Sequence, residues 1–143
     1  MCTVAFVTEP APPKQRHIVL ILARDLAANL ATAMLVADAE GELVFFNEPA
    51  ELILGRPFAE AQMTTADLAR AFRPVDEAGQ PVPADDLPLA TAFRTGIPSR
   101  GAFWIEAADG RRPHLEVVGV PLFAHVDQLV GGLAVFWERA EEA

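Results

Sequence analysis

Two hairpin signals constrain the fold more than any other feature of this sequence. In the first, Asp38-Ala-Glu-Gly41 separates the β-favouring runs Met34–Ala37 and Glu42–Phe46. In the second, Asp109-Gly110 divides the β-favouring stretch 100–122. Asp and Gly favour tight turns because they accept the backbone conformations that such turns require. Strands joined by a hairpin pair antiparallel, so the sequence predicts an antiparallel sheet and not the alternating βαβ pattern of a nucleotide-binding sheet.

Short helices are predicted between the two hairpins. Asn47 is a good N-cap residue, Pro49 suits a first helical turn, and Gly55 suits the left-handed position after a helix. These three residues predict a short helix that ends at Leu54. A second short helix is predicted to begin at a cap formed by Thr64 or Thr65.

A third short helix is predicted after the polar turn region 76–83. Asp85 or Asp86 is expected to cap it, with Pro88 in its first turn and Gly96 after its last residue. Three β candidates follow: Arg100–Glu106, His114–Leu122 and Gln128–Glu138. Strands grouped at both ends, with helices between them, predict an α+β domain whose helices collect on one side of the sheet.

An apolar helix is predicted ahead of the sheet, over Lys14–Thr32. This segment has no Gly or Pro and is rich in Ala and Leu. Its apolar positions recur at helical spacing: Ile18, Val19, Leu22, Leu26 and Leu30. A helix this apolar must either cover a sheet or pair with a copy of itself. Residues 1–13 contain three prolines and are expected to form a flexible arm, 33–139 the folded domain, and 140–143 a short tail.

Composition and charge exclude several classes of partner. The chain of 143 residues carries a net charge of −9, which disfavours nucleic acid and anionic membrane surfaces. Its longest apolar run, Ile18–Ala23, is far shorter than the ~20 residues that span a bilayer. Cys2 is the only cysteine, so no intrachain disulfide forms. These features together suit a cytoplasmic protein.

Two stretches resemble the PAS domain family. Residues 38–55 are similar to the opening of PAS domains, in which a strand leads through a Gly turn to a second strand and then to the pattern Asn-x-x-Ala-x-x-x-x-Gly. Residues 79–96 are similar to the family variant in which G-x-x-x-P, then L-P, A and G lead into the long helix. The resemblance extends over about 33–138. It implies a five-stranded antiparallel sheet of order 2-1-5-4-3, with helices forming one wall of a ligand cavity.

The resemblance also implies a sensory or signalling function. The residues expected between the sheet and the helices, and therefore near a ligand, are Phe46, Ile53, Leu68, Phe72, Leu89, Phe93 and Trp104. Whether they leave a pocket or simply fill the core is left open. Many PAS domains dimerise through a preceding helix, so the apolar residues of Lys14–Thr32 are expected to form a homodimer interface. The chain ends soon after its last predicted strand, so the expectation is either that the output protein is separate (a kinase, a cyclase or a transcription regulator) or that the chain is a fragment.

The residues disfavour the flavin, chromophore and haem cofactors that PAS domains are known to bind. A flavin photoreceptor needs a reactive Cys among its helices, whereas Cys2 lies in the arm, and a photoactive-yellow-protein mechanism needs a Tyr, which the chain lacks. Haem ligands of the family sit on the long helix, which here contains no His. His114 and His125 are interpreted as strand-end residues. The expectation is therefore a ligand of unknown identity and no cofactor.

Other chemistries remain as alternatives. Trp104 and Trp137 could stack on a flavin without a covalent link, although Trp in a sheet more often packs in the core. No metal site is expected, because capping explains the pair Asp85-Asp86 more simply. A small cone-pocket enzyme of isomerase or cyclase type would need an acid in an apolar cavity. Glu116 is the candidate, and strand alternation points it away from the core. A purely structural dimerisation module is the third alternative.

Overall fold

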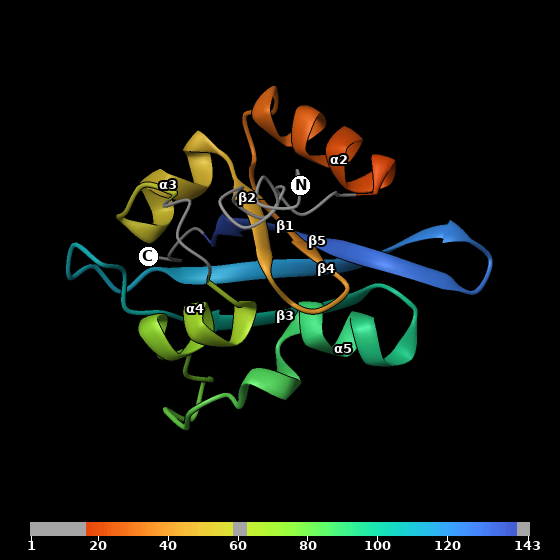
Figure 1. Ribbon diagram of the computed structural model, residues 1–143. Helices are drawn as coiled ribbons and strands as arrows, with labels where there is room; N and C mark the ends of the chain where they lie inside the picture. Colours follow the sequence, from red (N-terminus) through yellow and green to blue (C-terminus); the bar gives the residue numbers. More distant parts are fainter. Residues whose placement is uncertain (1–16, 59–62, 140–143) are drawn as a thin grey trace, which may run out of the picture.

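A five-stranded antiparallel sheet organises the chain in the computed structural model, which describes residues 17–58 and 63–139 (Figure 1). The strands are β1 Ala33–Asp38, β2 Leu43–Phe46, β3 Ser99–Trp104, β4 His114–His125 and β5 Gln128–Glu138. Their spatial order is β2-β1-β5-β4-β3, and every neighbouring pair is antiparallel. The predicted α+β class, strand order and both hairpins are confirmed. The predicted arm 1–13 and tail 140–143 lie outside the described residues.

Helices lie on both faces of this sheet. They are α2 Ile18–Ala28, α3 Glu48–Leu54, α4 Thr65–Phe72 and α5 Pro88–Thr95, with a 3-10 turn, η2, at Ala84–Asp86. Figure 1 shows α2 on the opposite side of the sheet from α4 and α5. The prediction that the helices collect on one side therefore holds for α3, α4 and α5. The leading helix α2 is shorter than the predicted Lys14–Thr32 and covers the other face.

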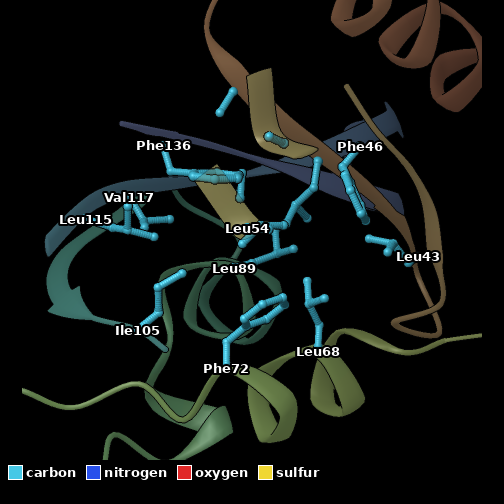
Figure 2. Close-up of a cluster of buried hydrophobic side chains, with 14 of the residues drawn as sticks. Leu43, Phe46, Leu54, Leu68, Phe72, Leu89, Ile105, Leu115, Val117 and Phe136 are labelled. Carbon is cyan, nitrogen blue, oxygen red and sulfur yellow. The ribbon is translucent and has the colours of Figure 1, made fainter. Parts of the chain in front are cut away.

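Strand β1 separates two hydrophobic cores. All six of its residues are buried, and successive side chains point to opposite faces of the sheet. Leu35 and Ala37 belong to the larger core under α3, α4 and α5, whose converging side chains Figure 2 shows. Met34 and Val36 pack against α2 in the smaller core. Because both faces are covered, β1 is a continuous apolar run from Ala33 to Ala37, without polar alternation.

Local capping chemistry sets most helix boundaries. Gly55 and Gly96 take left-handed conformations at the ends of α3 and α5, as predicted. Thr64 caps α4 in a reciprocal capping box with Asp67. The cap predicted for α5 is wrong, because Asp85 and Asp86 form the separate turn η2. The extended residue Leu87, which precedes Pro88, starts α5 without a side-chain cap bond.

Helix α5 lies directly on the backbone of the sheet. A Cβ atom at Gly119 of β4 would lie only 2.6 Å from the backbone nitrogen of Leu89 and from the carbonyl oxygen of Pro88. A Cβ atom at Gly132 of β5 would lie 2.5 Å from the ring of Phe93. Any larger residue at these two positions would push α5 away, so this close approach requires glycine.

One buried side chain joins three elements. The Asn47 side chain is 1% exposed, and its Oδ1 accepts hydrogen bonds from the backbone N–H groups of Met34, at 3.0 Å, and Ala50, at 3.1 Å. Its Nδ2 donates to the carbonyl oxygens of Ala27, at 2.9 Å, and Thr32, at 2.8 Å. The predicted cap of α3 is confirmed, and the same amide also holds the start of β1 and the end of α2.

Replacing this amide should destabilise the whole domain. Asn47→Asp keeps the acceptor but removes both donors, which leaves two carbonyl groups without their partner beside a buried carboxyl group. Since an unsatisfied buried polar group costs about 1–3 kcal/mol, we expect the free energy of unfolding to fall by about 3 kcal/mol or more in urea titrations. Asn29→Asp is the matched control, because the Asn29 side chain is exposed and, within the described residues, donates one hydrogen bond, from Nδ2 to the carbonyl oxygen of Asp25. Equal losses in the two variants would contradict this account of Asn47.

Candidate functional site

The larger core contains a cavity of about 110 Å³ between the sheet and the helices α4 and α5. Its lining residues are almost all apolar: Leu35, Leu54, Thr65, Leu68, Ala69, Phe72, Pro74, Leu87, Pro88, Leu89, Phe103, Ile105, Leu115, Val117, Ala134 and Phe136. Within this lining, the Thr65 hydroxyl is the single polar side-chain group. Figure 2 shows several of these side chains converging from the strands and from both helices.

The structure brings some of the expected ligand-contacting residues to this cavity. Leu68 and Phe72 reach it from α4, and Leu89 reaches it from α5. Phe46 is buried in the same core without lining the cavity, and Ile53 and Phe93 are partly buried against that core. Whether any of these side chains binds a ligand stays a prediction.

Trp104 faces away from the cavity, contrary to the expectation that it lies between the sheet and the helices. Its ring stacks on the imidazole of His114, with ring centroids 3.6 Å apart and planes 4° from parallel. Its chain neighbours Phe103 and Ile105 line the cavity instead. Alternation along the strand explains the difference, because only every second side chain faces the helices. Leu115 and Val117 of β4 also line the cavity and were not among the expected residues. The polar Glu116 between them is the sequence feature that could have identified them, because its two neighbours must point to the opposite face of the sheet.

The size and chemistry of the cavity restrict what it can hold. Drug-sized ligands occupy pockets of about 300–1,000 Å³, so 110 Å³ suits only a small molecule unless the helices move. The lining offers one hydroxyl, at Thr65, whereas a flavin ring buries several carbonyl and N–H groups that need partners. These residues therefore do not fit a flavin, and a small apolar molecule is the best match.

Comparison with known proteins identifies the architecture. No family model matches the sequence, and no curated protein matches it either. Among solved structures, the Rhodobacter sphaeroides LOV protein has a TM-score of 0.69 at 14% identity, over 87% of this chain and 69% of that one. The PAS domain of Bordetella pertussis BvgS has a TM-score of 0.58 at 16% identity, over 85% and 86%. A PAS domain from Colwellia psychrerythraea has a TM-score of 0.55 at 20% identity, over 85% and 97%.

The chain has the PAS fold. This agrees with the family resemblance seen in residues 38–55 and 79–96, and with the predicted strand order β2-β1-β5-β4-β3. At identities of 14–20% the comparisons establish the fold alone, so the function has to be argued from the residues of this PAS-fold domain.

The acid considered for an enzymatic cavity lies on the outer face of the PAS sheet. The Glu116 carboxylate accepts a hydrogen bond from Nε of Arg100 at 3.0 Å, and the Arg100 guanidinium lies 5.8 Å from the centre of the Trp137 ring. The Arg100 hydrogen bond is the main cause that lowers the pKa of Glu116, and the positive charge of Arg139 adds to it. Glu116 is thus an ionised partner on the sheet surface, across the strand from the cavity.

The described part of the chain contains neither a candidate metal site nor a membrane-spanning helix. Within residues 17–58 and 63–139, no group of three His, Cys, Asp or Glu side chains is placed to hold a metal ion. Over the same residues, no helix has the length and apolar character needed to cross a membrane.

The proposed dimer residues of α2 are mostly exposed. Leu20, Ala23 and Ala27 are buried against the sheet. On the opposite face, the side chains of Ile18, Leu22 and Leu26 are 63%, 60% and 54% exposed, and Ile21 and Leu30 extend the same apolar surface. Val19 is half-buried between the two faces. Helix α2 therefore covers the sheet and still presents an uncovered apolar stripe.

The lowered pKa of Glu116 predicts a pH-dependent contribution to stability. A depressed carboxyl pKa stabilises the folded state above the ordinary value of 4.5, and this contribution disappears as pH falls through the lowered pKa. We expect Glu116→Gln to have a lower Tm than the parent protein at pH 7. The difference should shrink as pH falls below the ordinary value and disappear once pH has passed through the lowered pKa of Glu116. Glu77→Gln, at an exposed turn, is the control, and a Tm difference for Glu116→Gln that persists in acid would refute the assignment.

Proposed function

We propose that this PAS-fold domain is a sensory module that binds a small apolar ligand in its inner cavity and acts as a homodimer joined through α2. The observation that carries the proposal is the cavity of about 110 Å³ with an almost wholly apolar lining. An empty apolar space of this kind stays dry and accepts apolar guests. The described lining contains no carboxylate or imidazole group, which favours binding over catalysis.

The position of β1 supplies a route from the cavity to the dimer surface. Leu35 of β1 lines the cavity, whereas its neighbours Met34 and Val36 pack against α2. A ligand that shifts Leu35 therefore also shifts the strand on which α2 rests. Because packed cores transmit displacement and do not absorb it, occupancy of the cavity would change the angle of α2. A separate output protein would read this change in the dimer.

The uncovered stripe on α2 supports a second copy of the chain as the partner. Ile18, Leu22 and Leu26 recur every four residues, which is the spacing that lets two helices pack along their length. One charged residue, Asp25, lies on the same exposed face three residues after Leu22, so two copies must pack with their Asp25 side chains apart or in solvent. Arg24 lies beside the stripe, where its guanidinium is 5.3 Å from the centre of the Phe45 ring.

Xenon is a suitable probe of the cavity because it is apolar, small and without directional contacts. We expect saturable shifts of the methyl NMR signals of Leu68, Leu89 and Val117 under xenon pressure. Ala134→Val should weaken xenon binding several-fold, because Ala134 lines the cavity and the added methyl groups occupy part of it. Ala102→Val, half-buried on the outer face of β3, should leave binding unchanged.

The xenon experiment also separates the alternatives. Unchanged xenon affinity in Ala134→Val would contradict the cavity proposal. If the protein retains no small molecule in native mass spectrometry and takes up no xenon, yet remains a dimer, the structural dimerisation module becomes the better description.

Charge placed on the α2 stripe should disrupt the dimer. We expect the parent protein to sediment as a dimer, and the double variant Leu22→Lys with Leu26→Lys to sediment as a folded monomer, because two ammonium groups would then face their copies in a desolvated interface. Leu52→Lys is the matched control, since Leu52 is 69% exposed on α3, away from the stripe. A parent protein that is monomeric at micromolar concentration would overturn the dimer proposal.

A further inference from the structure

A second cleft, of about 430 Å³, lies outside the core beside the end of α4. It is lined by Ala69, Arg70, Arg73, Pro74, Val75, Pro81, Val82, Ala84, Glu106 and Arg112. Its floor is held by backbone hydrogen bonds. The backbone nitrogen of Val75 donates to the carbonyl oxygen of Trp104, and that of Val82 donates to the carbonyl oxygen of Pro74, both at 2.9 Å. The cleft therefore has a preformed apolar floor.

The cleft is positively charged in an acidic protein. Its lining carries three of the ten arginines of the chain and a single carboxylate, Glu106, whereas the whole chain has a net charge of −9. Arg73 lies 3.7 Å from Glu106, and Arg70 pairs with Asp67 of its own helix. Arg112 forms no ion pair with any residue in the described ranges. The guanidinium groups thus outnumber the carboxylates that could neutralise them.

Arg73 also has an unfavourable backbone conformation at the edge of this cleft. Arg73 ends α4 in the left-handed conformation, with φ 47° and ψ 62°, and it is the one described non-glycine residue with positive φ. The equivalent positions of α3 and α5 are occupied by Gly55 and Gly96. A side chain is strained in this conformation, so its retention at the edge of the cleft indicates a use for the guanidinium group.

We propose that this cleft binds a small organic anion, with a phosphate or carboxylate group held by Arg73 and Arg112 and an apolar body lying on the floor. A guanidinium group binds either oxyanion through paired N–H donors. The floor residues Pro74, Val75 and Val82 offer apolar surface for the rest of the molecule. The volume of 430 Å³ lies within the range of about 300–1,000 Å³ found for small-molecule pockets. The proposal is independent of any ligand in the inner cavity.

Phenyl phosphate and benzoate are the probes, because both join an oxyanion to an apolar ring. In ¹⁵N–¹H NMR titrations we expect saturable shifts at the backbone amides of Arg73, Val75 and Val82. The probe with the higher affinity identifies the preferred anion. Inorganic phosphate should bind more weakly than phenyl phosphate because it has no apolar body. Absence of saturable shifts with both ring-bearing probes would overturn the proposal, and equal affinity for inorganic phosphate would overturn the role of the floor.

Three variants locate the binding. Arg112→Gln should weaken binding about tenfold, as expected for loss of a charge-assisted hydrogen bond. Arg24→Gln removes the same charge from α2, on the other side of the sheet, and should not change the affinity. An equal loss in both variants would show a general charge effect and overturn the site.

Arg73→Gly tests the role of the strained residue. This variant should raise Tm by relieving the left-handed strain and still weaken binding. Undiminished affinity in this stabilised variant would also overturn the proposal.

Discussion

The buried amide of Asn47 is the interaction on which the arrangement of layers depends. Its four hydrogen bonds reach the end of α2, the segment before β1, the start of β1 and the first turn of α3. Helix α2 lies on one face of the sheet and α3 on the other, so this one side chain fixes the position of α2 relative to β1 and α3. An amide is suited to this position because it offers a donor and an acceptor, and the surrounding backbone needs both. The PAS fold of this chain is therefore held together at a polar point between two apolar cores.

The two cores share strand β1, so their packing is mechanically coupled. Residues facing the cavity and residues facing α2 alternate along a strand of six residues. A displacement on one side cannot be confined there, because neighbouring side chains are rigidly joined through the backbone. Because both faces of β1 are buried, the strand has no polar residue before Asp38. Hydropathy alone therefore could not show which of its side chains point to the cavity and which point to α2.

Local chemistry made the fold predictable from the sequence. Turn residues at Gly41 and Gly110, the Asn47 cap and the left-handed Gly55 each act within a few residues, and the structure contains all of them. The site was less predictable. The facing of Trp104 depends on how β3 pairs with β4, and the extra turn η2 displaced Asp85 and Asp86 from the start of α5. The arginine cleft could not be predicted at all, because Arg73 and Arg112 are far apart in the sequence and line one cleft only in the folded chain.

The glycine contacts beneath α5 have a mechanical consequence. Because Gly119 lets the start of this helix approach the β4 backbone itself, and Gly132 leaves room only for the Phe93 and Leu89 side chains, that wall of the cavity has little space to yield. The opposite wall, α4, reaches the cavity through longer side chains such as Leu68 and Phe72, so this wall has more room to yield than α5. A guest that outgrows the cavity must therefore lift α4, whose Ala69 and whose following residue Pro74 border the arginine cleft as well. The inner cavity and the arginine cleft thus share a wall, so the two binding proposals together predict that occupancy of one space alters the other through the tilt of α4.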